Sequence, residues 1–202
     1  MQIEVRVRAK IDNPQSLIEK IEAKGAYFEG SSASASWYYG RELFEQKDIQ
    51  VRIVEHDYPE GIKKIYLTYK GPKAENQGRE EYSEIFGALK RNSRVFEKLG
   101  FPERDFTTPI DAEKILEKHG LSKFLEVKVS DEKKYRYGVY EVKFFHLDQV
   151  NIDLAEIELN VARAGDIPKA KEEIYKLMDE LGIARGNEIK EDGVMLVYRQ
   201  QK

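Results

Sequence analysis

Charged side chains recur at every second position along several segments of this sequence, and this spacing could create a reactive surface. Residues 2–10 alternate between apolar and polar side chains, and the charged ones are Glu4, Arg6, Arg8 and Lys10. In an extended chain, residues two apart project from the same face. The segment therefore predicts a strand with one apolar face and one face that carries charges of both signs.

The same alternation occurs in segments far along the chain. The polar residues that would share a face within these segments are Arg52 with Gln50, Lys64 with Tyr66, Thr68 and Lys70, Arg79 with Glu81 and Ser83, Lys134 with Arg136, and Glu156 with Glu158 and Asn160. Cations outnumber carboxylates in this set, but both signs are present.

Two explanations fit these mixed faces. The commoner one is an antiparallel sheet with one face in solvent. The alternative is that the faces line the inside of a barrel, where a polar lumen can hold a ligand. Arg and Lys would bind the oxygens of a polyphosphate, and carboxylates would bind its divalent cation. A nucleic-acid groove would not favour the carboxylates.

Strands and helices must position these residues. The strands that we expect span residues 1–10, 49–55, 62–70, 79–85, 124–129, 133–137, 140–148, 154–161 and 194–199. Helices are expected from Asp12–Pro14 to Gly25, at about 86–99, at about 109–119 and at about 168–181, and residues 30–36 are expected to form a loop. Caps such as Asn13, Thr108 and Asp166 and terminating glycines such as Gly120 support these helices.

The order of the predicted elements favours an α+β fold. Strands and helices do not alternate regularly, so a doubly wound parallel sheet is disfavoured. Meandering strands with flanking helices favour a closed antiparallel β-barrel, and nothing in residues 1–202 requires a division into separate domains.

Composition narrows the function classes. The 202 residues include 34 Lys and Arg, 37 Asp and Glu, and no Cys, so disulfides, thiolate zinc sites and a cysteine nucleophile are excluded. The net charge of −3 argues against a protein built for bulk nucleic-acid binding. No segment approaches the roughly 18 apolar residues of a membrane span, and no signal peptide is expected, so the predicted location is cytoplasmic.

Seven sequence blocks resemble the CYTH superfamily, which includes CyaB-type class IV adenylyl cyclases, thiamine triphosphatases and inorganic triphosphatases. In order, they are Gln2-Ile3-Glu4-Val5-Arg6, Val51-Arg52-Ile53, Leu67-Thr68-Tyr69-Lys70-Gly71-Pro72, Arg79-Glu80-Glu81, Lys134-Tyr135-Arg136, Leu147-Asp148 and Ala155-Glu156-Ile157-Glu158. The Leu-Thr-Tyr-Lys-Gly-Pro block looks most like the CyaB-type branch.

The resemblance implies a triphosphate tunnel with one or two Mg²⁺ or Mn²⁺ ions. The implied metal ligands are Glu4, Glu81, Asp148, Glu156 and Glu158. The implied substrate-binding cations are Arg6, Arg8, Arg52, Lys70, Arg79, Lys134 and Arg136. Of these residues, Glu4, Arg6, Lys70 and Arg136 are the expected catalytic set.

The sequence departs from the family signature at its first strand. Gln2 stands where the signature has its first Glu, which removes a negative charge, and Arg6 stands where it has Lys. Three functions therefore stay open: a CyaB-like cyclase that converts ATP to cyclic AMP and pyrophosphate, a related triphosphatase acting on tripolyphosphate or thiamine triphosphate, and a catalytically weak binder of such compounds. An RNA-directed role is the least favoured, and a homodimer stays open.

Overall fold

The computed structural model describes residues 3–72, 80–87, 89 and 92–202, and it has an α+β fold. Eight strands form one antiparallel sheet in the order β1-β8-β7-β6-β2-β3-β4-β5. The strands are β1 (Ile3–Ile11), β2 (Tyr27–Tyr39), β3 (Gln50–Asp57), β4 (Lys63–Lys70), β5 (Glu81–Ile85), β6 (Lys123–Tyr137), β7 (Tyr140–Leu147) and β8 (Ile152–Val161). The predicted α+β class and antiparallel sheet are confirmed, whereas closure into a barrel stays a prediction.

Six α-helices accompany the sheet in the described part of the chain. They are α1 (Pro14–Ala23), α2 (Arg41–Lys47), α3 (Arg94–Lys98), α4 (Pro109–Lys118), α5 (Ile167–Leu181) and α6 (Gly193–Gln200). Two short 3-10 turns, Ala164–Asp166 and Arg185–Asn187, flank α5. None of the helices in this described part is both long enough and apolar enough to span a membrane.

The chain forms two compact units, and the long strands β2 and β6 contribute to both. The first unit comprises Met1–Ala33 and Lys128–Lys202, and the second comprises Ser34–Val127. The prediction of a single domain over residues 1–202 stays a prediction.

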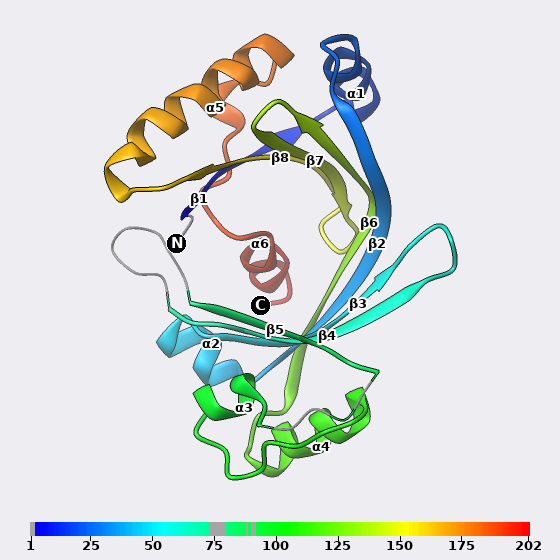
Figure 1. The fold of residues 1–202 in the computed structure, drawn as a ribbon, viewed down its shortest axis with the longest axis vertical. Coiled ribbons are helices and arrows are strands. Elements are labelled where there is room, and N and C mark those ends of the chain that lie inside the picture. The colour runs from blue at the N-terminus through cyan, green and yellow to red at the C-terminus, as the bar shows by residue number, and fades with distance from the viewer. Residues whose placement is uncertain (1–2, 73–79, 88, 90–91) are drawn as a thin grey trace. The chain divides into compact units, whose positions relative to one another are not determined.

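In the first unit, the apolar faces of the strands pack beneath two helices. Val7 of β1, Val142 of β7 and Ile157 of β8 are almost fully buried, together with Ile21 of α1 and Ile174 of α5. Figure 1 shows α1 and α5 over β1 and β8. Successive side chains of a strand project to opposite faces of the sheet. The residues that alternate with these buried ones therefore project from the face opposite the helices.

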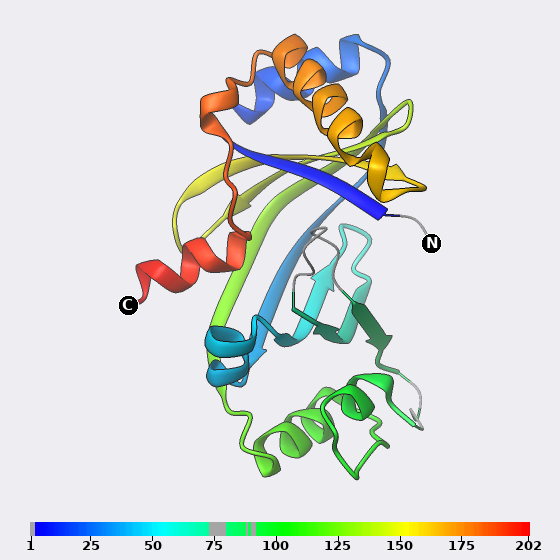
Figure 2. The same ribbon diagram turned by 90° about the vertical axis from the view of Figure 1, so that its left-hand side faces the viewer.

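In the second unit, strands β3, β4 and β5 pack against α3 and α4. The core contains Val51 and Leu67 from the strands, and Phe96 and Leu116 from the helices, all fully buried. Figure 2 shows α3 and α4 close together near β4 and β5.

Most predicted helix ends are confirmed, but Asp166 before α5 forms no side-chain capping hydrogen bond. The Asn13 side chain accepts a hydrogen bond from the Ser16 amide at 3.0 Å, and Thr108 forms a capping box with Asp111. Gly25 follows α1 with a φ of 87°, a left-handed conformation that glycine adopts at little cost.

Two predictions of secondary structure are wrong. Residues 30–36 form part of β2 rather than a loop, because pairing within the sheet overrides the weak strand propensity of Gly and Ser. Residues 194–199 belong to helix α6 rather than a strand. A short apolar run is compatible with either a helix or a strand. Here tertiary packing favours the helix, in which Val194, Val197 and Tyr198 are buried at helical spacing.

Two predicted boundaries differ from the structure, and one helix was missed. The helix expected at 86–99 is only Arg94–Lys98 among the described residues, because Gly87 and Asn92 adopt positive φ values and Ser93 caps the helix. Residues 88, 90 and 91 lie outside the described residues. The strands expected at 124–129 and 133–137 are one strand, β6, whose register against β7 shifts between Ser130 and Lys133. Helix α2 was not predicted.

Candidate functional site: a mixed-charge face of the first unit

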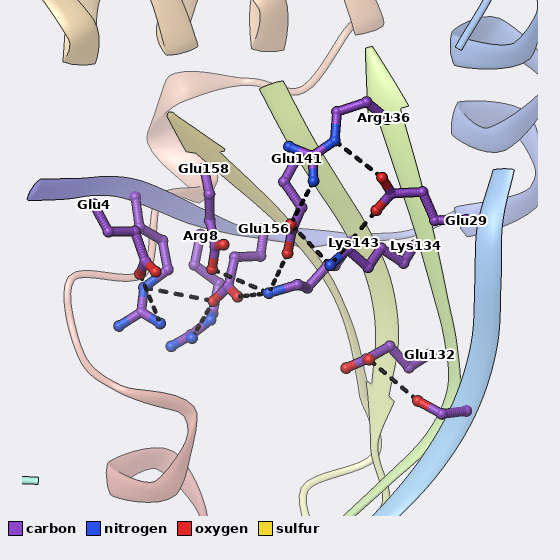
Figure 3. Close-up of polar contacts among 12 residues, drawn as sticks. Glu4, Arg8, Glu29, Glu132, Lys134, Arg136, Glu141, Lys143, Glu156 and Glu158 are labelled. Atoms are coloured by element: carbon purple, nitrogen blue, oxygen red, sulfur yellow. Dashed lines mark hydrogen bonds and ion pairs between the residues drawn. The ribbon is translucent and has the colours of Figure 1, made fainter. Parts of the chain in front are cut away.

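Charged side chains form two rows across β1, β8, β7 and β6 on the face opposite the apolar core. The first row is Arg8, Glu156, Lys143 and Lys134. The second row is Arg6, Glu158, Glu141 and Arg136. We call these eight residues the mixed-charge face. Figure 3 shows side chains from both rows projecting toward one another.

Glu156 is the most enclosed member, with only 5% of the residue exposed. Its carboxylate forms an ion pair with Arg8, and it lies 3.7 Å from Arg6 Nε and 3.6 Å from Lys143 Nζ. Burial by itself would raise the pKa of Glu156, but Arg8, Arg6 and Lys143 outweigh that effect and hold the pKa below its usual range. Glu156 therefore stays ionised and holds three cations in place.

Glu158 lies next to Glu156 on the same face, and 8% of it is exposed. Burial raises the pKa of Glu158 to about 8, and the neighbouring Glu156 and Glu4 carboxylates add to the shift although Lys143 opposes it. Glu158 therefore favours its protonated form, because two adjacent buried negative charges repel.

Lys143 connects the two rows. Its Nζ lies 3.0 Å from Glu141 Oε1, 3.2 Å from Glu158 Oε1 and 3.6 Å from Glu156 Oε1. Burial alone would lower the pKa of Lys143, but Glu158 and Glu156 raise it. The ammonium group is therefore charged and held by three carboxyl groups.

The β6 end of the face carries two further cations. Lys134 Nζ lies 2.8 Å from Glu141 Oε2, and Arg136 Nη2 lies 3.0 Å from the same oxygen. Glu29 on β2 accepts a hydrogen bond from Arg136 Nε at 3.0 Å and lies 3.5 Å from Lys134 Nζ. The Lys134 and Arg136 side chains are 36% and 39% exposed, so both cations remain accessible to a ligand.

The β1 end contacts the segment that leads into α6. Arg6 Nη2 lies 3.5 Å from Asp192 Oδ1, and Arg8 Nη1 donates a hydrogen bond of 3.3 Å to the Glu191 carbonyl. Glu4 lies 3.8 Å from Arg6 Nη1, and its side chain is 52% exposed. Arg8 Nε is buried without a hydrogen-bond partner among the described residues. This end therefore contains one buried guanidinium donor, Arg8 Nε, whose hydrogen-bonding capacity is not satisfied by the described residues.

The acidic residues at this end match the donor chemistry of a hard divalent cation. Burial and the neighbouring carboxylates favour the protonated form of Glu158, and a Mg²⁺ or Mn²⁺ ion could replace that proton and neutralise the repulsion. Within the described ranges, however, no group of three or more acidic or histidine side chains is arranged to hold an ion. The carboxylates at this end are therefore suitable ligand types for Mg²⁺ or Mn²⁺. Among the described residues, however, three such ligands do not converge on one point.

The second unit has its own polar face, on which three of the predicted residues lie. Arg52 Nη1 donates to Tyr38 Oη at 3.3 Å, and its guanidinium lies 5.9 Å from the centre of the Tyr38 ring. Lys70 Nζ lies 3.1 Å from Glu81 Oε2 on the adjacent strand. This face is thus also mixed in charge, and it lies opposite the buried Val51 and Leu67 positions.

The structure brings most of the residues predicted in the first unit together. Glu4, Arg6, Arg8, Lys134, Arg136, Glu156 and Glu158 lie on or beside the mixed-charge face. Asp148 does not, because it occupies the turn after β7, where it accepts a hydrogen bond from Ser130 Oγ at 2.7 Å. Gln2 and Arg79 lie outside the described residues.

Sequence reasoning missed four charged residues of this region. Glu141 and Lys143 alternate with Val142 and Phe144, so the rule that selected Lys134 and Arg136 would also have selected them. Glu29 was missed because it directly precedes residues 30–36, which were predicted to form a loop rather than a strand. Glu132 was missed because the β6 irregularity breaks the alternation there, and the sequence indicated only a turn at that point.

A model of the CYTH domain family matches residues 1–191, nearly the whole chain. The chain belongs to the CYTH domain family. The family resemblance of the sequence blocks is therefore confirmed, and the mixed-charge face lies within the matched CYTH region. No curated protein matches the chain in sequence.

Solved structures share the fold at low sequence identity. The PH1819 protein from Pyrococcus horikoshii is 21% identical, with a TM-score of 0.71 over 98% of this chain and 99% of that one. A protein from Vibrio parahaemolyticus described as a candidate adenylate cyclase is 14% identical, with a TM-score of 0.72 over 98% of each chain. A Hippeastrum protein described as a candidate adenylyl cyclase with a dominant triphosphatase activity is 15% identical, with a TM-score of 0.65 over 100% of this chain and 97% of that one. These likenesses concern the fold.

Proposed function

We propose that this CYTH protein is a metal-dependent enzyme that processes a triphosphate compound. The mixed-charge face carries the proposal: five cations, Arg6, Arg8, Lys134, Arg136 and Lys143, share one sheet face with buried carboxyl groups. Charge-assisted hydrogen bonds from Arg and Lys suit phosphate oxygens, and Arg can contact two oxygens at once. The activity would be that of a CyaB-like adenylate cyclase or a closely related triphosphatase.

The cations would bind and orient the phosphates. Glu156 and Glu141 form ion pairs with these cations and hold them in position on the face. Such preorganised charge stabilises the charge that develops on phosphoryl oxygens and on the leaving group. Arg52 and Lys70 of the second unit would add cations if, as the sequence predicts, the sheet closes into a tunnel.

Mg²⁺ or Mn²⁺ is the proposed cofactor, with Glu158 and Glu4 as its principal ligands and Glu156 beside them. When bound, the ion would neutralise charge on the phosphates and polarise the phosphorus–oxygen bonds. Glu81 and Asp148 remain weaker candidates. Glu81 is engaged with Lys70, and Asp148 is set apart in a turn.

The cyclase and the triphosphatase differ in the attacking oxygen. In the cyclase, the ribose 3′-hydroxyl attacks the α-phosphorus and pyrophosphate leaves. In the triphosphatase, water attacks the terminal phosphorus. The descriptions of the Vibrio and Hippeastrum structures include both activities, and that is why both are proposed.

Purified protein should be incubated with ATP, tripolyphosphate or thiamine triphosphate, each with Mg²⁺ or Mn²⁺. Cyclic AMP with pyrophosphate identifies a cyclase, and release of inorganic phosphate identifies a triphosphatase. A folded protein that turns over none of the three compounds would contradict the enzyme proposal.

The second candidate is a catalytically weak binder of triphosphates. It is favoured by the lack of three converging metal ligands within the described ranges and by Gln2 in the family signature. Tight tripolyphosphate binding without turnover would support it. Activity restored by Gln2→Glu would indicate an impaired enzyme instead.

A further inference from the structure

Glu132 occupies an irregular position in β6, next to the mixed-charge face. The register between β6 and β7 shifts between Ser130 and Lys133, and Asp131 has a positive φ of 51°. A bulge of this kind redirects side chains relative to regular alternation. Figure 3 shows Glu132 on the side of the strands from which Lys143 and Glu156 project.

The bonding of Glu132 differs from that of the other carboxyl groups in this region. Glu156, Glu141 and Glu29 each form ion pairs with at least two cations. Glu132 Oε1 instead accepts one hydrogen bond, from the neutral Ser32 hydroxyl on β2 at 3.2 Å. Lys134 and Lys143 form their ion pairs with other carboxyl groups, namely those of Glu29, Glu141, Glu156 and Glu158. The Glu132 carboxyl group is therefore not committed to holding either cation in place.

The charged groups that face Glu132 come from three strands. They are Lys143 on β7, Lys134 on β6 and Glu156 on β8, and the neutral Ser32 hydroxyl on β2 donates a hydrogen bond to Glu132. Burial and Glu156 raise the pKa of Glu132, and Lys143, Ser32 and Lys134 lower it by less, so its pKa lies above the ordinary glutamate value. A carboxylate with a raised pKa accepts a proton more readily than an ordinary glutamate.

We infer that Glu132 accepts the proton of the hydroxyl group that attacks phosphorus. This inference rests on the proposed function and adds a proton acceptor to it. In the cyclase reaction, the 3′-oxygen bonds to the α-phosphorus, the bond from that phosphorus to the bridging oxygen breaks, and pyrophosphate carries away the electron pair. In the triphosphatase reaction, a water oxygen bonds to the terminal phosphorus and the remaining diphosphate leaves. In both, the proton passes from the attacking oxygen to Glu132 and then to solvent.

The test compares Glu132→Gln with the wild-type protein and with Glu19→Gln, a control on the exposed surface of α1. The substrate is whichever of ATP, tripolyphosphate and thiamine triphosphate the wild type turns over. For Glu132→Gln, kcat should fall on the order of 10²- to 10³-fold, as expected for loss of a general base. The calorimetric Kd for tripolyphosphate should change by less than about twofold, because Glu132 holds none of the phosphate-binding cations.

The pH dependence separates proton transfer from a structural role. Wild-type kcat should rise with pH as Glu132 ionises, and this rise should be absent in Glu132→Gln. Ser32→Ala keeps the carboxyl group but removes the hydrogen bond that favours its ionised form, so the rise should move to higher pH. Ser32→Ala also keeps the inference testable if Glu132→Gln fails to fold.

The possible outcomes are distinct. An active wild type with an equally active, folded Glu132→Gln overturns the role of Glu132 alone. A slower Glu132→Gln that retains the pH rise, or a pH rise unmoved in Ser32→Ala, also overturns it. A wild type that is inactive on all three compounds overturns both this inference and the proposed function.

Discussion

Lys143 on β7 lies directly opposite Glu156 on β8, and its Nζ is 3.6 Å from Glu156 Oε1. This pair lies at the centre of the mixed-charge face, with Arg8 on the far side of Glu156 and Lys134 on the far side of Lys143. Because Glu156 is buried, its charge sets the positions of the surrounding cations. The pair would therefore link the stability of the fold to the proposed binding of phosphate.

Replacing Glu156 with Gln should destabilise the protein. The substitution keeps the side-chain shape but leaves Arg8 and Lys143 without their shared buried partner, and breaking a buried ion pair typically costs about 3–5 kcal/mol. We expect the free energy of unfolding in urea to fall by about 3 kcal/mol or more.

The matched control for this substitution is Glu180→Gln. Glu180 also pairs with a lysine, Lys24 at 2.8 Å, but its side chain is 53% exposed. An exposed pair contributes at most about 1 kcal/mol, so the control should change little. Equal, small effects of the two substitutions would show that Glu156 does not anchor the face.

Replacing Lys143 with Gln should weaken triphosphate binding. Hydrogen bonds to charged groups contribute about 1.5–3 kcal/mol, which corresponds to a rise in Kd of about 10- to 100-fold. Calorimetry with tripolyphosphate measures this change. Lys169→Gln is the control, since the Lys169 side chain on α5 is 82% exposed and lies outside the mixed-charge face. A Kd that is unchanged in folded Lys143→Gln would remove Lys143 from the binding site.

Glu158 should make the stability of the metal-free protein fall as pH rises. Its pKa is raised from about 4.5 to about 8 by folding, so the folded state binds more protons than the unfolded state between these values. The contribution of Glu158 is fully present below pH 4.5 and is lost as pH rises through about 8. Urea unfolding across this range in the presence of a chelator should show the decline.

Glu158→Gln is the comparison for that pH series. The substitution removes the titrating group, so the decline in unfolding free energy above pH 4.5 should be smaller than in the wild type. A decline of the same size in both proteins would assign the effect to other groups.

Glu158 should also control the need for metal. If it is a metal ligand, Glu158→Gln should raise the Mg²⁺ or Mn²⁺ concentration that gives half-maximal turnover by about tenfold or more. A metal titration of activity measures this, with Glu19→Gln as the surface control. The same half-maximal concentration in all three proteins would exclude Glu158 as a ligand.

Much of the first unit follows from the sequence, because strict alternation in β1 fixes which side chains are buried. The same alternation predicts that Arg6 and Arg8 share one face of β1, and that Glu156 and Glu158 share one face of β8. Which charges become neighbours depends on strand register, and the pairing of Arg8 with Glu156 and of Glu156 with Lys143 comes from contacts about 148 and 13 residues apart in the chain.

Other features depend on tertiary packing. The residues of the 30–36 segment have weak strand propensity and become a strand because neighbours pair with them, and the Val194–Arg199 run becomes helical because one side packs. Glu132 reaches its position through a bulge that alternation cannot indicate. The position of Asp148 in a turn likewise follows from where β7 ends.

The most direct test of the account is a crystal structure with tripolyphosphate and Mg²⁺ bound. We predict phosphate oxygens within hydrogen-bonding distance of Arg8 and Lys143, with the metal ion at Glu158. Triphosphate bound elsewhere, with Arg8 and Lys143 still paired only to Glu156, would contradict the assignment of the mixed-charge face.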